Sequence, residues 1–163
     1  MKIRNPQYSS TADNFELNSI CGGIACGTLA GGNLSLLVST LGSPYAFNGD
    51  GKIIFIEEIN EPPYKIDRML TSLMLAGVFS HAQGILLGSF KDCRGICLPD
   101  NPSCTAAPDT NASSLLNTFK EVLSPLGIPV LAGLACGHSY PQLTLPLGCK
   151  IIMNTDRKTI EII

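Results

Sequence analysis

Three short, uninterrupted apolar runs most constrain what this chain can fold into. They span residues 52–56, 84–88 and 128–131 (KIIFI, GILLG and IPVL). A continuous apolar run of this length is typical of a strand buried on both faces of a parallel sheet. Between the runs, apolar residues recur at helical spacing over residues 63–76 and 115–123. Strands that alternate with helices predict an α/β fold.

Turn and capping residues mark the elements that precede the first run. A short apolar segment at 27–30 is predicted to be a strand, and Gly31-Gly32 then turns the chain. Asn33 is a suitable N-cap for a helix over residues 34–41, because its side chain can accept a hydrogen bond from a free backbone N–H. The turn and the cap together explain this segment without a phosphate-binding loop.

The two ends of the chain are predicted to behave differently. Residues 1–23 are polar and lack periodicity, so we expect an irregular segment or linker remnant ahead of one domain at 24–163. At the other end, residues 151–153 and 159–163 are two apolar segments around a turn, which predicts a closing hairpin. A hairpin added to parallel strands makes the predicted sheet mixed.

Composition excludes several classes of protein. The chain has 163 residues, 45% of them apolar, which suits one domain with a substantial core. Its net charge is -2, from 11 basic and 13 acidic residues, and this gives no electrostatic case for binding nucleic acid. No apolar run reaches the roughly 20 residues that span a bilayer, and the N-terminus lacks an apolar signal region. We therefore expect a cytoplasmic protein that does not act at a membrane.

Two adjacent acids, Glu57 and Glu58, follow the first apolar run at the predicted end of a strand. In open α/β sheets, ligands gather beyond the carboxyl ends of the strands. Adjacent strand residues point to opposite faces, so at most one of the two acids faces a given pocket. The alternative is that both are solvated charges at the end of a strand.

His138 lies in a Gly- and Pro-rich segment, residues 133–148, that is predicted to be a loop. Such a loop suits an exposed catalytic histidine, although a loop histidine can equally be hydrogen-bonded to the backbone. A strand-end glutamate and a loop-borne histidine together would form the base-orienting half of a Ser-His-Glu triad. In that arrangement the histidine takes the nucleophile's proton and the glutamate holds the imidazole tautomer.

Cysteine is frequent, with seven residues and no signal peptide, which favours reduced thiols. Cys93, Cys97 and Cys104 form a C-x3-C-x6-C pattern in a long polar loop over residues 91–110. Metal binding, a disulfide and free thiols all remain open for these three, and we assign no cofactor. The other four have apolar or Gly-rich neighbours and are predicted to be small core residues: Cys21, Cys26, Cys136 and Cys149.

Several longer motifs occur in a characteristic order. They are AGGNLSLL at 30–37, LGSPY at 41–45, KIIFIEEINEPPY at 52–64, GILLGSF at 84–90, and GH at 137–138 followed by LPLG at 145–148. In this order and spacing the chain, from about residue 24 to residue 163, resembles the C-terminal domain of the L,D-carboxypeptidases. That family includes the muramoyltetrapeptide carboxypeptidases and the microcin C immunity peptidases.

The resemblance implies a mixed-sheet domain of the swivelling β/β/α type and a serine peptidase with a Ser-Glu-His triad. Members remove the terminal D-alanine from murein tetrapeptides during cell-wall recycling. By motif position, the catalytic glutamate is Glu57 and the histidine is His138, while Asn33 is a candidate for the substrate pocket. In this family the serine comes from an N-terminal domain.

The sequence departs from the family pattern because it has no G-x-S-x-G elbow and no other serine in a strand–turn–helix setting. We therefore expect the chain alone to be inactive, with the serine-bearing N-terminal domain as its partner and a homodimer as a further option. Two rival functions remain. One is a non-catalytic peptide-binding module, and the other is a metal protein centred on Cys93, Cys97 and Cys104.

Overall fold

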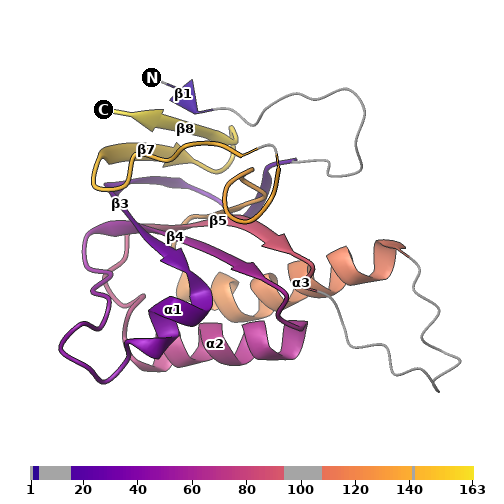
Figure 1. Ribbon diagram of the computed structural model, residues 1–163. Helices are drawn as coiled ribbons and strands as arrows, with labels where there is room; N and C mark the ends of the chain where they lie inside the picture. Colours follow the sequence, from indigo (N-terminus) through magenta and orange to yellow (C-terminus); the bar gives the residue numbers. More distant parts are fainter. Residues whose placement is uncertain (1, 4–15, 94–107, 141) are drawn as a thin grey trace, which may run out of the picture.

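The computed structural model describes residues 2–3, 16–93, 108–140 and 142–163. Within these residues, eight strands form one curled sheet, and three α-helices lie together on one side of it (Figure 1). In chain order the elements are β1 (Lys2–Ile3), β2 (Asn18–Cys21), β3 (Ile24–Asn33), α1 (Leu34–Ser39), β4 (Lys52–Ile59), α2 (Pro63–Leu75), β5 (Gly84–Lys91), α3 (Pro108–Leu123), a 3-10 turn (Ser124–Leu126), β6 (Val130–Ala132), β7 (Lys150–Asn154) and β8 (Thr159–Ile162).

The sheet is mixed, with strand order β1-β8-β7-β3-β4-β5-β6-β2. Strands β3, β4, β5 and β6 run parallel and form its centre. On one side β7 and β8 form an antiparallel hairpin beside β3, and β1 pairs antiparallel with β8. On the other side β2 pairs antiparallel with β6. The predicted fold class, an α/β domain with a mixed sheet of the swivelling β/β/α type, is confirmed.

One face of the central strands packs against the helices. Ile54 and Ile56 of β4 and Leu87 of β5 point to this side and are fully buried. The helical spacing predicted over 63–76 matches α2, whose apolar stripe buries Ile66, Leu70 and Leu73 against this face. Burying this stripe, rather than helix propensity, holds α2 in place.

The opposite face of the same strands carries the other set of alternating residues. Ile53 and Phe55 of β4 and Leu86 of β5 point to this side. They are covered by apolar residues of the β7–β8 hairpin and by Leu134 and Cys136, from the segment between β6 and β7. That segment is the predicted loop of residues 133–148, so its packing onto this face positions His138.

The N-terminal segment differs from the prediction. Residues 1–23 were expected to be irregular, but they contain β1 and β2, which pair at the two opposite edges of the sheet. Both strands are short, and their partners lie far along the chain, so no local pattern reveals them. The domain boundary at residue 24 stays a prediction, and residues 4–15 lie outside the described residues.

Two other boundaries also moved. Strand β4 continues through both acids to Ile59, whereas Glu57 and Glu58 were expected to follow its end. Helix α3 begins at Pro108, inside the predicted loop of residues 91–110, and most of that loop (94–107) lies outside the described residues.

The core prediction for the cysteines holds only in part. Cys136 is buried and Cys21 is partly buried, but Cys26 and Cys149 are exposed. Cys26 lies on β3, where alternation turns it away from the buried neighbours Ala25 and Gly27. An apolar sequence context therefore does not decide which face of a strand is covered.

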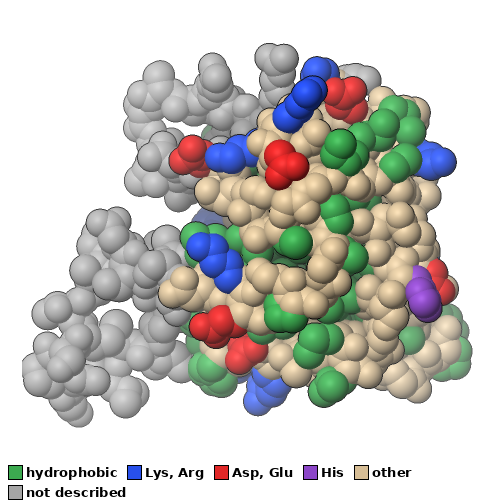
Figure 2. Space-filling view, turned by 180° about the vertical axis from the view of Figure 1, so that it is seen from behind, with side chains coloured by type: hydrophobic (Ala, Val, Ile, Leu, Met, Phe, Trp, Pro, Cys, Tyr) green, Lys and Arg blue, Asp and Glu red, His purple; other side chains and the backbone are tan. Residues whose placement is uncertain are grey.

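The surface carries charges of both signs. From behind, Lys and Arg side chains lie interspersed with Asp and Glu side chains, and hydrophobic side chains show as several separate groups (Figure 2). Among the described helices, none has both the length and the apolar character to cross a membrane.

Candidate active site

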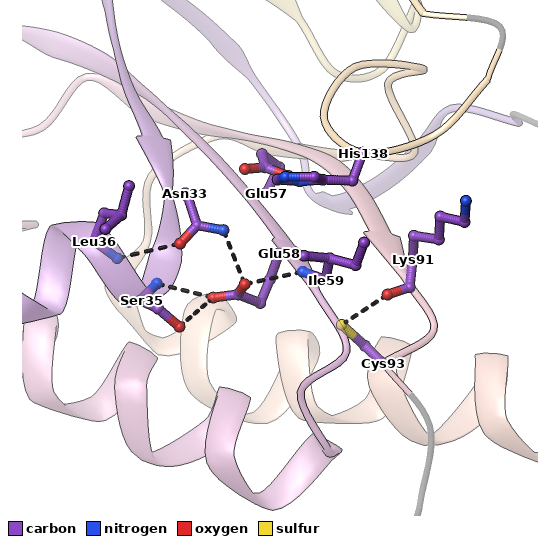
Figure 3. Close-up of polar contacts among 9 residues, drawn as sticks. All are labelled: Asn33, Ser35, Leu36, Glu57, Glu58, Ile59, Lys91, Cys93 and His138. Atoms are coloured by element: carbon purple, nitrogen blue, oxygen red, sulfur yellow. Dashed lines mark hydrogen bonds and ion pairs between the residues drawn. The ribbon is translucent and has the colours of Figure 1, made fainter.

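Glu57 and His138 meet at the carboxyl end of β4. His138 Nδ1 lies 2.7 Å from Glu57 Oε2, and the ring lies alongside the carboxylate (Figure 3). The Glu57 side chain is only 7% exposed, whereas the His138 side chain is 49% exposed. A buried carboxylate thus holds one nitrogen of a half-exposed imidazole.

Strand alternation aims Glu57 at the loop. It lies two residues after Phe55 and shares the face of β4 that is opposite the helices. Glu58 points to the helix side, so the two acids lie on opposite faces of β4 and contact different residues. Both residues are buried, Glu57 at 6% exposure and Glu58 at 3%, so the alternative of two solvated charges is wrong.

The loop that carries His138 is fixed to β5 by backbone hydrogen bonds. Leu134 N donates to Leu87 O (3.1 Å), and Ser89 N donates to Cys136 O (2.7 Å). The pairing register between β4 and β5 shifts at this point, as expected of a bulge. At Gly88 a Cβ atom would lie 2.4 Å from Cys136 O, so only glycine allows the loop to come this close.

Gly137 has a specific structural role beside His138. Its φ is +126°, and a Cβ atom there would lie 2.7 Å from Glu57 Oε2. Both observations require glycine, because other residues rarely adopt this φ and would collide with the carboxylate. The Gly-His dipeptide therefore brings the backbone across Glu57 and delivers the ring to it.

The geometry suits general base chemistry. A carboxylate only accepts hydrogen bonds, so neutral His138 must carry its proton on Nδ1 to donate to Glu57, which leaves the Nε2 lone pair free. Nε2 has no hydrogen-bond partner among the described residues. No serine hydroxyl in this part of the chain bonds it either, and the neighbouring Ser139 is buried with its Oγ unpartnered. The free Nε2 is therefore available to accept a proton, which is the arrangement that a general base needs.

A cavity of about 420 Å³ opens beside the pair. Its walls include Phe55 and Cys136, which lie two residues before Glu57 and His138 respectively, and the remaining lining residues are Gly32, Gln142, Leu143, Thr144, Leu145 and Leu147. Burial raises the pKa of the Cys136 thiol, and the negative charge of Glu57 raises it further. The cavity wall is therefore within electrostatic reach of Glu57, while the described lining residues carry no charged side chain.

Glu58 forms the second polar cluster of the region, which the sequence did not predict (Figure 3). Its carboxylate accepts hydrogen bonds from Asn33 Nδ2 (2.8 Å), Ile59 N (2.9 Å), Ser35 N (2.8 Å) and Ser35 Oγ (2.6 Å). Burial raises the pKa of Glu58, but these hydrogen bonds together outweigh burial, so its pKa lies below the usual value. Glu58 is therefore ionised at neutral pH.

Asn33 is the N-cap of α1, as predicted. Its Oδ1 accepts a hydrogen bond from Leu36 N (3.2 Å), while its Nδ2 donates to Glu58. Its neighbour Gly32 lines the cavity, but Asn33 is not among the lining residues. Its role in a substrate pocket stays a prediction.

The cysteine cluster is described only at Cys93, since Cys97 and Cys104 lie outside the described residues. Cys93 is 1% exposed, and burial raises its pKa to about 11. It is a free thiol that contacts Lys91 O at 3.5 Å. Among the described residues, no group of three or more His, Cys, Asp or Glu side chains is arranged to hold a metal ion.

Comparisons with known proteins agree on one family. The model of the LD-carboxypeptidase C-terminal domain matches residues 26–153. A probable murein peptide carboxypeptidase of Bacillus subtilis is 37% identical over 160 residues, which are 98% of this chain and 47% of the relative. The microcin C7 self-immunity protein MccF of Escherichia coli is 36% identical over 83% of this chain and 36% of its own length.

Solved structures give the same result. MccF in complex with glutamyl sulfamoyl guanosine superposes with a TM-score of 0.70 at 31% identity, covering 93% of this chain and 41% of that one. The muramoyltetrapeptide carboxypeptidase of Oxalobacter formigenes superposes with a TM-score of 0.68 at 30% identity, covering 86% of this chain and 45% of that one. The chain thus spans less than half the length of these relatives.

Proposed function

This chain belongs to the LD-carboxypeptidase family through that family's C-terminal domain, and from this premise we propose that it supplies the glutamate and histidine of a Ser-Glu-His triad. The observation that carries the proposal is the 2.7 Å contact between His138 Nδ1 and Glu57 Oε2, with Nε2 left free. The substrate would be a murein tetrapeptide, from which the terminal D-alanine is removed. The names of the Bacillus subtilis and Oxalobacter formigenes relatives support this substrate class.

In the proposed reaction His138 Nε2 accepts the proton of a serine hydroxyl as the serine oxygen attacks the scissile carbonyl. The imidazolium then gives this proton to the departing amine of D-alanine. Glu57 keeps the ring in the required tautomer and stabilises the imidazolium while the charge exists. A water molecule then releases the acyl group with the same histidine acting as base.

The serine would come from an N-terminal domain that docks against this chain. Relatives are more than twice as long as the matched part, which supports a second domain. Large apolar side chains are exposed in this region: Tyr140, two residues after His138, at 86%, and Leu147, which lines the cavity, at 54%. Covering these side chains would exclude water from the reacting centre, which strengthens the electrostatic interactions there.

The cavity beside the pair would hold an uncharged part of the peptide. Its described lining residues are mostly apolar, with Gln142 and Thr144 as the polar side chains, and none of them is a cation. A terminal carboxylate needs a positive charge or several N–H donors, so it would be held by other groups. Specificity would therefore draw on both domains.

The decisive experiment joins this chain to the part of the Bacillus subtilis relative that precedes its matched 160 residues. We expect the chain alone to release no D-alanine from murein tetrapeptide and the chimaera to release it. His138→Ala and Glu57→Gln in the chimaera should lower kcat by at least about 100-fold, the low end of typical acid–base contributions. His81→Ala is the matched control, because this second histidine is exposed and lies outside the site.

Release that survives His138→Ala would contradict the proposed mechanism. Binding of the tetrapeptide by a folded, assembled chimaera without any release would favour the peptide-binding module instead. Size-exclusion chromatography of the chain and of the chimaera separates failed assembly from failed chemistry and also tests the homodimer.

A further inference from the structure

Glu58 is a buried charge on a face of β4 where the preceding residues are apolar. On the helix-side face of β4 it follows Ile54 and Ile56, both of which are fully buried against the helices. Replacing a buried charge by an apolar residue of similar size is often neutral or stabilising. Stability of the core alone therefore does not account for a carboxylate here.

The hydrogen bonds of Glu58 converge from one place, the junction of β3 and α1. Three of its four donors belong to Asn33 and Ser35, and the fourth is the backbone N–H of the next residue, Ile59. Asn33 Oδ1 and Glu58 Oε2 together satisfy two of the free N–H groups at the start of α1, those of Leu36 and Ser35. A short helix of six residues is thus capped from within the sheet.

The junction that Glu58 holds forms part of the candidate site. In the register of β3 and β4, Asn33 is the partner of Glu57, and Gly32 lines the cavity. Figure 3 shows Asn33 between the two acids, with Glu58 below it and the Glu57–His138 contact above. The two adjacent acids therefore act on opposite faces of one strand, Glu57 on the histidine and Glu58 on the junction.

The junction of β3 and α1 needs a fixed point because the two residues before it, Gly31 and Gly32, have no side chains to hold the backbone in place. Gly31 has a φ of +134°, and a Cβ atom there would lie 2.0 Å from Phe55 O, so the chain approaches β4 closely at a bend. Two consecutive glycines leave the backbone little side-chain packing to hold it. The hydrogen bonds from Asn33 and Ser35 to the Glu58 carboxylate fix the backbone directly after these two glycines.

We propose that Glu58 is a positioning residue of this site, whose carboxylate fixes Asn33 and, next to it, the cavity-lining Gly32, and, through the backbone of β4, holds Glu57 in contact with His138. The effect of Glu58 on catalysis rests on the proposed function. Its effect on the contact between Glu57 and His138 does not, because that contact can be measured on the chain alone.

The test uses the nitrogen chemical shifts of the His138 ring, which report which nitrogen carries the proton. In the wild-type chain at alkaline pH, we expect the proton on Nδ1 and an unprotonated Nε2. Glu58→Gln keeps the size of the side chain but presents an NH2 group toward the donors of the junction, so Glu57 should lose its fixed orientation. The His138 shifts should then move toward the average of both tautomers, and the amide signals of Gly32 and Asn33 should broaden or move.

Glu161→Gln is the matched control, since Glu161 is a carboxylate of β8 that forms an ion pair with Lys2, at 3.2 Å. It should leave the His138 ring unchanged, and the His81 ring serves as an internal reference in every spectrum. A folded Glu58→Gln chain with wild-type His138 shifts and wild-type Gly32 amides would overturn the proposal, because a purely local cap would produce that result.

If Glu58→Gln does not fold, Ser35→Ala replaces it. This variant removes the hydroxyl donor at 2.6 Å and keeps the backbone donor of the same residue. It should shift the His138 tautomer in the same direction by a smaller amount. Unchanged ring shifts in this folded variant would also overturn the proposal.

The chimaera adds a functional reading. Glu58→Gln should lower kcat/KM by about 10- to 100-fold through kcat, the range that a small misplacement of catalytic groups produces. An unaltered kcat beside a shifted tautomer would contradict the catalytic importance of the positioning by Glu58. A wild-type chimaera without activity would count against the proposed function alone, because the ring shifts decide the positioning role independently.

Discussion

His138 Nδ1 and Glu57 Oε2 lie 2.7 Å apart although 81 residues separate the two side chains along the chain. The contact needs Gly137, whose backbone crosses directly over the carboxylate. The site is therefore as sensitive to the backbone next to the histidine as to the two side chains.

Gly137→Ala should separate the pair. The added Cβ would lie 2.7 Å from Glu57 Oε2 and would also be forced into a φ of +126°. We expect a loss of about 1–3 kcal/mol in the free energy of unfolding, measured with denaturant, and a change in the His138 ring shifts. Gly32→Ala is the matched control, because a Cβ there meets nothing within 4 Å, and it should change stability by less than about 0.5 kcal/mol. Wild-type stability and ring shifts in Gly137→Ala would contradict the geometry.

Acid should weaken the fold through Glu58. Its pKa lies below the ordinary value of 4.5 because its hydrogen bonds outweigh its burial. A lowered pKa contributes stability that is present above the ordinary value and is lost as pH falls through the pKa of the folded state. Glu58→Gln should therefore cost about 2 kcal/mol near neutral pH and progressively less as the pH falls below that value.

Denaturant unfolding at a series of pH values measures this difference. Glu161→Gln, with its half-exposed carboxylate, should show a small difference from wild type at every pH. If the difference in the free energy of unfolding between wild type and Glu58→Gln stayed the same down to the lowest pH, Glu58 would not be the ionised carboxylate described here.

Thiol reagents should separate the cysteines by exposure. Burial raises the pKa of Cys93 to about 11 and also raises that of Cys136, so near-neutral solution leaves both as protonated thiols. Cys26 and Cys149 are exposed and should be alkylated first. Peptide mass spectrometry after brief treatment with iodoacetamide measures the order, and rapid labelling of Cys93 in the folded chain would show that its burial is wrong.

The buried stripe of α2 should account for a large part of the stability. Leu73 is fully buried, while its near neighbour Leu75 is 81% exposed. Leu73→Ala should lower the free energy of unfolding by about 2–5 kcal/mol, and Leu75→Ala should change it by less than about 0.5 kcal/mol. Equal effects in the two variants would mean that α2 presents another face to the sheet.

The elements that the sequence predicted well are those with a local signal. The apolar runs at 52–56 and 84–88 became β4 and β5, and the helical spacing after Pro63 became α2. Asn33 was recognised as a cap because capping joins residues three positions apart. These patterns need only the neighbouring sequence.

The parts that the sequence missed depend on distant partners. Strands β1 and β2 exist because β8 and β6 pair with them, and neither has a hydrophobic pattern of its own. Alternation predicted that Glu57 and Glu58 face opposite ways, and the family pattern selected Glu57 for the site. What no local rule could show is that Glu58 is also buried, since its donors lie at residues 33 and 35, more than 20 residues before it.

The placement of β1 and β2 has a consequence for biogenesis. The ribosome makes these two strands before any other described element, yet their partners are β8, the final strand, and β6, made after α3. Both edges of the sheet therefore stay open until synthesis of the domain is nearly finished, and loop closure over such distances slows folding. A nascent chain stalled before β8 would expose unpaired strand edges, the kind of surface that chaperones recognise and that aggregation exploits.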